Sequence, residues 1–219
     1  MNKTPQIDEW SGDFGLEYTK RNSFSLKKFD NSYREKYGLT RTELNRRFLD
    51  DLNRGIKILE VGSNIGIQLA LLQKMGFENL YGIEINKYAV QLSKKFTKDI
   101  NIIWGSAFDI PFKDGYFDLV FTSGVLIHIH PSDIKIVMEE IYRCSKKYIW
   151  GFEYYSEDYT EIEYRGHKNL LWKANFPKLY TEFFKDLKLV KIEFIKYLHD
   201  SNIDVMFLLE KNHKVEVAK

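Results

Sequence analysis

The sequence is short of several residue types, and each shortage excludes a class of protein. It has one cysteine, Cys144, so no internal disulfide can form, and no spacing of cysteine and histidine suggests a metal site. Cys144 lies beside the apolar positions of an expected helix, which makes core packing its expected role. No apolar run approaches the roughly 20 residues that cross a bilayer. Met1–Trp10 lacks the apolar core of a signal peptide, so a cytoplasmic location is expected by default.

The sequence also lacks a large excess of either basic or acidic residues. The 33 basic and 31 acidic residues leave a formal net charge of +2. An enzyme that acts on nucleic acid usually has a strongly basic face, so no nucleic-acid partner is expected. Hydrophobic residues make up 44% and charged residues 29% of the 219 residues, which indicates a globular protein with a sizeable core.

From Ile56 onward, strand-like and helix-like segments alternate, as in βαβ units on a parallel sheet. Short buried strands are expected at Ile56–Val61, Leu80–Ile85, Ile100–Trp104, Phe117–Ser123 and Tyr148–Phe152. Helices are expected at Ile67–Met75, after a cap at Asn86, and from Pro131–Ser132. Alternating apolar residues at 190–194 and 203–209 predict two antiparallel strands at a sheet edge. The predicted fold is α/β and Rossmann-like, with a mostly parallel seven-stranded sheet and an antiparallel C-terminal edge pair.

Residues 1–55 predict an N-terminal helical cap on a domain that runs from residue 56 to residue 219. The motif TRTE at residues 40–43 fits a capping box at the start of a helix that leads into the first strand. The segment before it holds several aromatics without a clear period and suits a lid, in which Tyr18 and Arg21 close over a ligand. Alternatively, Trp10, Phe14 and Tyr18 are spaced as one buried face of a helix.

The most specific motif is the glycine turn EVGSNIG at residues 60–66, between an expected strand and an expected helix. Gly62 permits a sharp turn and the close approach of a ligand, and Gly66 lets the helix pack near the strand. Asn64 stands where glycine often occurs, and asparagine tolerates a left-handed backbone. The free N–H groups of the helix suit a carboxylate or a phosphate. A plain tight turn is the alternative interpretation.

The acid that precedes the turn narrows the choice of ligand. The dinucleotide fingerprint G-x-G-x-x-G has a different spacing, and a pyrophosphate gains nothing from a carboxylate such as Glu60. A ligand with an ammonium group does gain from it. The ammonium and carboxylate of a methionine moiety fit between Glu60 and the helix N–H groups.

Three further positions favour an adenosine ligand. Glu84 ends the second expected strand about 20 residues after Gly62, where an acid can bind ribose hydroxyls, although a solvated glutamate is the alternative. Small residues follow the third strand and leave room for a flat purine, to which Ser106 can hydrogen-bond. The fourth strand ends at Ser123, on the sheet edge where the ligands of such sheets lie.

In this order, these features resemble class I S-adenosylmethionine-dependent methyltransferases over residues Ile56 to Phe152. Longer stretches resemble one subfamily, the methylases associated with pseudaminic acid biosynthesis. These stretches are Trp10–Asn22, Thr40–Asn45, Glu60–Leu72, Tyr81–Val90, Gly105–His128, Tyr148–Tyr155 and Tyr164–Trp172. The resemblance implies S-adenosyl-L-methionine as the cofactor and a setting in bacterial glycan modification. It does not by itself settle the acceptor, for which we expect a sugar or nucleotide sugar.

The resemblance also implies which residues contact the cofactor. They are Glu60, Gly62, Ser63, Asn64, Gly66, Glu84, Ile85, Ser106 and Ala107. We add Tyr18 and Arg21 from the expected lid and Ser123 from the strand edge as further cofactor-binding candidates.

His128 is the catalytic candidate. It follows the fourth expected strand, in a loop that should border the transferable methyl group, and it resembles the histidine at this position in many small-molecule methyltransferases. A histidine can take a proton from an acceptor near neutral pH. The alternative is that His128 packs against or caps the next helix. His130 adjoins Pro131 and suits helix entry instead.

An acceptor-binding insertion is expected near residues 153–172. Tyr154, Tyr155, Arg165 and His167 are its substrate-binding candidates, because aromatic faces and a guanidinium suit a sugar ring with a carboxylate or phosphate. The alternative is an ordinary lid that packs on the sheet. We therefore expect a small-molecule acceptor, an anionic sugar, and no membrane partner.

Other functions stay open from the sequence. A nicotinamide-dependent oxidoreductase is the alternative from another enzyme class, and the glycine spacing argues against it. A binding module without catalysis is opposed by the intact set of Glu60, Gly62, Gly66 and Glu84. A methyltransferase with this cofactor site can also act on another small molecule or on a protein.

Overall fold

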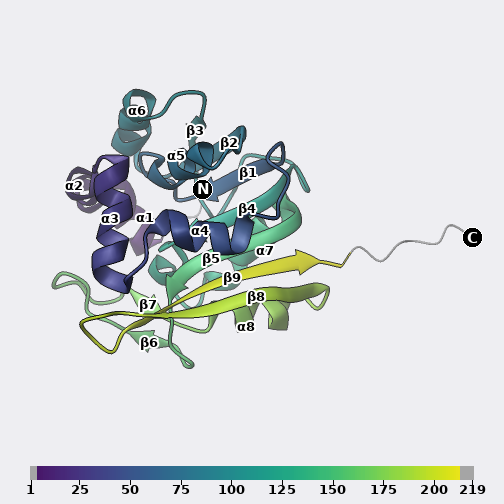
Figure 1. Cartoon of the computed structure of the whole chain (residues 1–219). Coiled ribbons are helices and arrows are strands. Elements are labelled where there is room, and N and C mark those ends of the chain that lie inside the picture. Colours follow the sequence, from purple (N-terminus) through teal and green to yellow (C-terminus); the bar gives the residue numbers. More distant parts are fainter. Residues whose placement is uncertain (1–3, 213–219) are drawn as a thin grey trace, which may run out of the picture.

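The computed structural model describes residues 4–212. Its central feature is a seven-stranded sheet in the order β3-β2-β1-β4-β5-β9-β8 (Figure 1). β1 to β5 run parallel, whereas β9 is antiparallel to β5 and to β8, which confirms the predicted sheet with its antiparallel edge pair. The strands of this sheet are β1 (Lys57–Val61), β2 (Asn79–Glu84), β3 (Asn101–Trp104), β4 (Phe117–Ser123), β5 (Ser145–Tyr154), β8 (Leu187–Lys196) and β9 (Ile203–Lys211).

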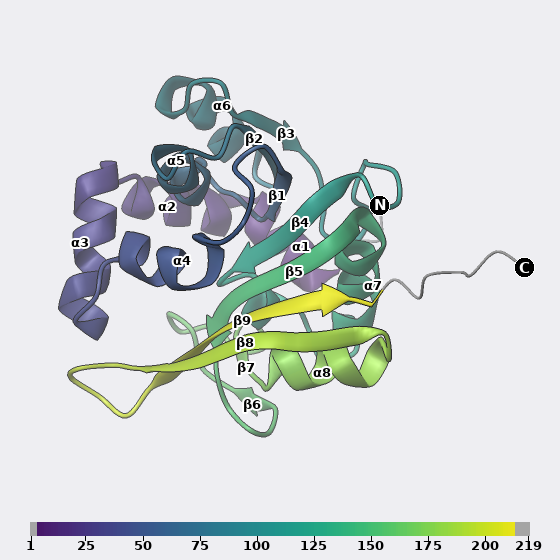
Figure 2. The same cartoon turned by 45° about the vertical axis from the view of Figure 1, so that its right-hand side comes forward.

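Helices cover both faces of the sheet and give three layers (Figures 1 and 2). One face packs against α3 (Leu26–Tyr37), α4 (Arg41–Leu49), α5 (Ile67–Lys74) and α6 (Lys87–Phe96). The other face packs against α7 (Ile134–Cys144) and α8 (Phe176–Phe183). The central strands are buried on both faces, so their sequences are continuous apolar runs, such as Leu119 to Phe121 in β4. Cys144 packs in this core, as expected.

Two short helices, α1 (Pro5–Ser11) and α2 (Asp13–Asn22), lie before α3 in the chain. Gly12 separates them in an extended conformation, with φ −92° and ψ −153°. The alternative of one continuous helix through Trp10, Phe14 and Tyr18 is therefore wrong. The three rings still meet, because Trp10 lies 5.2 Å from each of the other two ring centroids. α4 begins with the expected capping box of Thr40 and Glu43.

The helix expected from Pro131–Ser132 begins later, at Ile134. Residues 131–133 form a turn in which Ser132 donates its backbone N–H to the His130 ring, at 3.2 Å, and contacts that ring again through its hydroxyl. Local side-chain bonds of this kind compete with the first helical turn, and Asp133 becomes the residue before the helix. A short 3₁₀ helix, η1 (Leu126–His128), precedes this turn. A separate two-stranded sheet joins β6 (Thr160–Glu161) to β7 (Trp172–Lys173).

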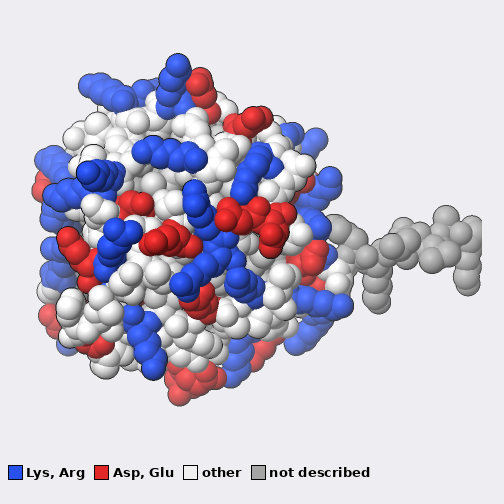
Figure 3. Space-filling model, viewed as in Figure 1, with Lys and Arg blue, Asp and Glu red and all other residues white. Residues whose placement is uncertain are grey.

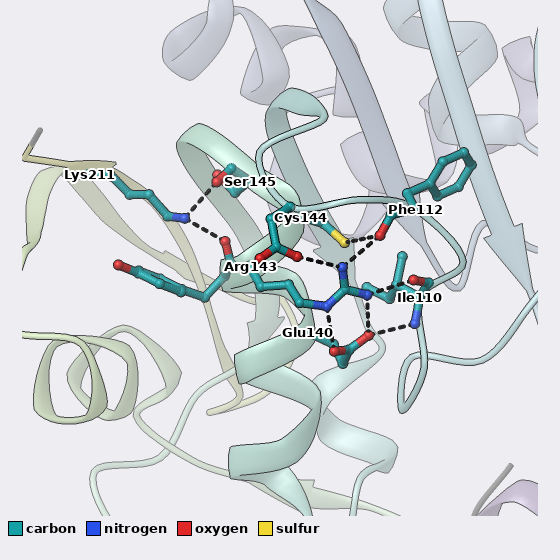
Figure 4. A network of polar contacts seen from close by, with 9 residues as sticks. Ile110, Phe112, Glu140, Arg143, Cys144, Ser145 and Lys211 are labelled. Atoms are coloured by element: carbon teal, nitrogen blue, oxygen red, sulfur yellow. Dashed lines mark hydrogen bonds and ion pairs between the residues drawn. The ribbon is translucent and has the colours of Figure 1, made fainter.

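A network of polar contacts fixes the segment between β3 and β4 to α7 (Figure 4). The Arg143 guanidinium donates to the backbone carbonyls of Ile110 and Phe112, at 2.7 and 2.6 Å. The Glu140 carboxylate accepts from the backbone N–H of Ile110 at 2.7 Å and also binds Arg143. On the other side of the same helix end, Lys211 of β9 donates to the carbonyls of Tyr142 and Ser145. The segment that follows β3 is therefore held at several points.

Basic and acidic side chains are interspersed on the face shown in Figure 3, without a large patch of one sign. Among the helices of residues 4–212, none is long and apolar enough to cross a membrane. The same stretch of chain has no cluster of His, Cys, Asp or Glu that could hold a metal ion.

Candidate active site

A cavity of about 220 Å³ lies at the C-terminal ends of β1, β2 and β4 and is bordered by α1 and α2. Ligands of open parallel sheets bind at this edge. The predicted residues that line the cavity are Tyr18, Glu60, Gly62, Ser63, Asn64, Glu84, Ile85, Ser106, Ala107, Ser123 and His128. Arg21 is exposed on α2, and neither Arg21 nor Gly66 is part of the cavity wall.

The glycine turn has the backbone that its sequence suggests. Gly62, Asn64 and Gly66 all have positive φ, at 75°, 47° and 83°. The left-handed conformation of Asn64 shows how asparagine replaces glycine here. A Cβ atom at Gly66 would come within 2.5 Å of the Ile102 side chain on β3. Gly66 therefore lets α5 begin close to the sheet, as expected.

Glu84 is buried at the end of β2, with 7% of its surface exposed, so the alternative of a solvated glutamate is wrong. Its two oxygens accept hydrogen bonds from the backbone N–H groups of Asn64 and Asn86, at 2.8 and 2.7 Å. The carboxylate thus joins the glycine turn to the start of α6. A carboxylate has about four acceptor positions, so two remain for the hydroxyls of a ligand.

Four buried polar atoms in the cavity wall have no hydrogen-bond partner among residues 4–212: Glu60 Oε2, Ser63 Oγ, Gln68 Oε1 and Trp10 Nε1. A buried polar atom without a partner costs about 1–3 kcal/mol, so a ligand that supplies partners is stabilised here. Burial raises the pKa of the Glu60 and Glu84 carboxyl groups, and a cationic group on the ligand would offset that burial. A ligand with an ammonium group and several hydroxyls fits this donor and acceptor set.

His128 lies in η1, directly after β4, and lines this cavity. Its Nδ1 is 2.7 Å from the backbone carbonyl oxygen of Leu170, which can only accept, so Nδ1 carries the proton and Nε2 has a free lone pair. Burial lowers the pKa of His128 to about 4. The imidazole is therefore neutral at pH 7. Its ring centroid lies 4.4 Å from that of Trp10 on α1.

Glu153 holds the loop that carries His128. This buried residue of β5 accepts hydrogen bonds from the backbone N–H groups of Val125 and Ile127, at 3.0 and 3.5 Å. Burial raises its pKa to about 7. Sequence reasoning missed Glu153 as a site residue, because only the tertiary structure places β5 beside the end of β4.

A second cavity of about 130 Å³ adjoins the first, and the two share Tyr18, Tyr33, Ser123, Gly124 and His128 as wall residues. The wall also includes Lys36, Tyr37, Phe152, Tyr154, Tyr164, Leu171 and Asp204. Sequence reasoning found Tyr154 and missed Lys36 and Asp204. One signal was present: Asp204 is the acid within an otherwise apolar run at residues 203–209 of β9.

The other predicted acceptor-binding residues lie outside both cavity walls. Tyr155 donates its hydroxyl to Glu157 at 2.6 Å. Arg165 and His167 are exposed on the loop after β6, where the Arg165 guanidinium lies 5.8 Å from the Tyr164 ring centroid. The structure thus brings Tyr154 to the site but leaves the other three at its periphery.

Comparison with known proteins agrees with this geometry. Residues 59–148, which include the glycine turn, Glu84 and His128, match the family described as a methyltransferase domain. A search of curated proteins finds no match.

Solved structures share the fold. One is the 1,6-didemethyltoxoflavin-N1-methyltransferase of Burkholderia thailandensis, with bound 1,6-didemethyltoxoflavin and S-adenosylhomocysteine, with a TM-score of 0.71 and 13% identity over 97% of this chain and 92% of that chain. Another is the magnesium protoporphyrin IX methyltransferase of Synechocystis PCC 6803 with bound S-adenosylmethionine, with a TM-score of 0.68 and 11% identity over 96% of this chain and 100% of that chain. The matched domain and the polar groups of the cavity wall favour methyl transfer over the nicotinamide alternative. The chain has the class I methyltransferase fold, and the matched domain supports methyl transfer that depends on S-adenosyl-L-methionine.

Proposed function

We propose that the enzyme methylates a small molecule, namely a sugar or nucleotide sugar of a bacterial glycan pathway of the pseudaminic acid type. The sugar assignment is supported by the resemblance of long stretches of the chain to that subfamily. The observation that carries it is the second cavity, whose wall of tyrosines adjoins the cofactor cavity. Aromatic faces pack on the apolar faces of sugar rings, and phenolic hydroxyls exchange hydrogen bonds with sugar hydroxyls.

In this proposal, different residues of the first cavity contact different parts of the cofactor. Glu60 and Ser63 face the methionine moiety, Glu84 accepts from the ribose hydroxyls, and Ser106 and Ala107 border the adenine. The other assigned contacts are those of Gly62, Asn64, Ile85, Ser123 and Tyr18. When bound, the cofactor supplies an electrophilic methyl group on a sulfonium.

His128 is proposed to position the acceptor. With Nδ1 bonded to Leu170, its Nε2 is an acceptor fixed in direction, and His128 lines both cavities. An ordered hydrogen-bond acceptor of this kind aligns a sugar hydroxyl for in-line attack. α1 and α2 line one side of the first cavity and would limit the access of water to the reaction.

The test is to incubate the enzyme with cofactor carrying a CD₃ methyl group and a panel of nucleotide sugars and free acidic sugars. Mass spectrometry should find one sugar with a mass increase of about 17 Da, because a CD₃ group of about 18 Da replaces a hydrogen of about 1 Da. At a cofactor concentration below saturation, the Glu84→Ala enzyme should produce less of it than the wild type. Labelling of a protein or of a different small molecule from a cell extract, with no sugar labelled, would contradict the sugar assignment and leave the methyltransferase intact.

A further inference from the structure

A buried carboxylate faces the second cavity. Asp204 lies near the start of β9 with 1% of its surface exposed. It accepts hydrogen bonds from the hydroxyls of Tyr37, at the end of α3, and Tyr197, just after β8, the latter at 3.2 Å. Two donors on the carboxylate leave acceptor positions free for a group that enters the cavity.

A cation lies near Asp204 in the same cavity wall. The Lys36 ammonium lies 4.1, 5.0 and 5.4 Å from the ring centroids of Tyr197, Tyr37 and Tyr154. Within residues 4–212, no carboxylate oxygen comes within 4 Å of this ammonium. The cavity therefore offers a hydrogen-bond donor and a separate acceptor, which is complementary to a molecule with several hydroxyl groups.

Methylation of a hydroxyl requires a destination for its proton. His128 is poorly suited, because its pKa of about 4 makes it a weak base. Asp204 is a stronger candidate, since burial raises its pKa to about 6, which is closer to neutral pH while leaving it ionised at pH 7. The charged and titratable groups that face Asp204 are Tyr33, Lys36 and Tyr37 of α3, Arg41 of α4, Tyr154 of β5, and Tyr197.

We propose that the second cavity binds the methyl acceptor and that Asp204 takes the proton from the acceptor hydroxyl during transfer. The O–H bond breaks and its proton moves to the Asp204 carboxylate. The hydroxyl oxygen forms the new bond to the methyl carbon, and the electron pair of the broken carbon–sulfur bond stays on sulfur. This inference rests on the proposed function for the class of acceptor, but the charge of Asp204 can be tested without any acceptor.

The test compares two cofactor analogues by calorimetry at pH 8. Sinefungin has a carbon in place of the sulfur and carries an ammonium group at the position of the transferable methyl group, where S-adenosylhomocysteine has no group, and this ammonium projects toward the acceptor. If Asp204 faces that position, the wild-type enzyme binds sinefungin about tenfold or more tightly than S-adenosylhomocysteine, because an opposite charge lies nearby. In Asp204→Asn, the two affinities should agree within about twofold. In Asp200→Asn, which removes an exposed carboxylate from the same hairpin, the preference should persist.

Two results would overturn the proposal. One is a sinefungin preference that persists in folded Asp204→Asn, and the other is a preference lost equally in Asp200→Asn. If Asp204→Asn does not fold, the same comparison is made with the wild-type enzyme over a range of pH. The ratio of the affinities for sinefungin and S-adenosylhomocysteine should fall toward one as pH drops through about 6. A ratio that stays constant from pH 8 to pH 5 contradicts the assignment. A sinefungin preference that is lost in Asp204→Asn, together with no methylated sugar, would refute the sugar proposal but support the position of Asp204 beside the acceptor.

Discussion

At the scale of single residues, Glu84 has two functions in one position. Its carboxylate binds the backbone N–H groups of Asn64 and Asn86, and it faces the cofactor cavity. A substitution there changes the hydrogen bonds to the glycine turn as well as the proposed contacts to the ribose. An experiment on Glu84 must therefore measure folding and binding separately.

Glu84→Ala should lower cofactor affinity by about tenfold or more, since hydrogen bonds to a charged group contribute about 1.5–3 kcal/mol each. Isothermal titration calorimetry with S-adenosylhomocysteine measures this, and circular dichroism checks the fold. Glu84→Gln is the matched variant, because it keeps the shape of the side chain but loses its charge. Its cofactor affinity should lie between those of the wild type and Glu84→Ala. Unchanged affinity in a folded Glu84→Ala protein would remove Glu84 from the cofactor site.

His128→Ala should lower kcat by about 100-fold, the order of loss expected when an acceptor is misplaced by about 1 Å. Affinity for S-adenosylhomocysteine should change little, because the assigned role is toward the acceptor. His128→Asn is the matched variant, since its amide can still donate to the Leu170 carbonyl. Turnover is measured with the sugar identified by mass spectrometry, and wild-type turnover in His128→Ala would exclude the role.

At the scale of elements, the segment between β3 and β4 depends on a helix that is distant in sequence. Ser106 and Ala107 line the cofactor cavity, and the end of the same segment is fastened to α7 by Arg143 and Glu140. Figure 4 shows the guanidinium between the two carbonyls and the carboxylate. The positions of Ser106 and Ala107, which we assign to the adenine, therefore depend partly on contacts outside the cavity.

Arg143→Ala should destabilise the fold by about 1–2 kcal/mol, because its hydrogen bonds are charge-assisted but the side chain is 29% exposed and screened by water. Cofactor affinity should fall several-fold, since the segment that ends at Phe112 gains freedom. Urea unfolding and calorimetry measure the two effects. Arg143→Lys keeps one donor and should recover part of the stability. A cofactor affinity equal to that of the wild type would show that the adenine pocket does not depend on this network.

The loop after β6 provides a second test at this scale. Arg165 is exposed and outside both cavity walls, so it can reach only an acceptor that extends beyond the second cavity. If the acceptor is an anionic sugar held by Arg165, Arg165→Ala should raise KM for it about tenfold and leave S-adenosylhomocysteine affinity unchanged. Arg165→Lys should recover only part, because it cannot make two parallel hydrogen bonds. A wild-type KM in Arg165→Ala would show that Arg165 does not hold the acceptor and would favour the alternative that this loop is a lid.

At the scale of the whole molecule, buried carboxyl groups couple stability to pH. Burial raises the pKa of Asp204 to about 6 and that of Glu153 to about 7, above their values of about 4 in an unfolded chain. Between these values the folded state binds more protons than the unfolded state. The contribution of each group to stability is therefore greatest at low pH and is lost as pH rises through the folded-state pKa.

Between pH 4 and pH 7.5, the wild type should lose about 3 kcal/mol of stability relative to Asp204→Asn, and about as much relative to Glu153→Gln. The magnitude is a shift of about two pKa units at 1.36 kcal/mol each. Urea unfolding at several pH values measures it, and the difference between wild type and variant cancels the effect of other groups. A difference that does not vary with pH would show that these carboxyl groups titrate normally.

The sequence by itself determined the elements and the cofactor edge. Alternation of short apolar runs and amphipathic helices predicted the mostly parallel sheet, because burial on both faces leaves continuous apolar strands. The turn at residues 60–66 predicted its own left-handed backbone, since that depends on Gly62, Asn64 and Gly66 themselves. The contact of Glu84 with this turn depends in addition on the pairing of β1 with β2. The break at Gly12 was missed, because an aromatic spacing of four residues does not reveal a single extended glycine.

Only the tertiary structure decided what surrounds the acceptor position. Lys36, Tyr37, Tyr154 and Asp204 come from α3, β5 and β9, and no spacing along the chain connects them. The pairing of β9 with β5 places Asp204 opposite Tyr154, and the packing of α3 on that face adds Lys36 and Tyr37. A cofactor site built from one turn and its adjoining strand ends can be read locally, whereas an acceptor pocket is formed by long-range contacts whose energy depends on the packed fold.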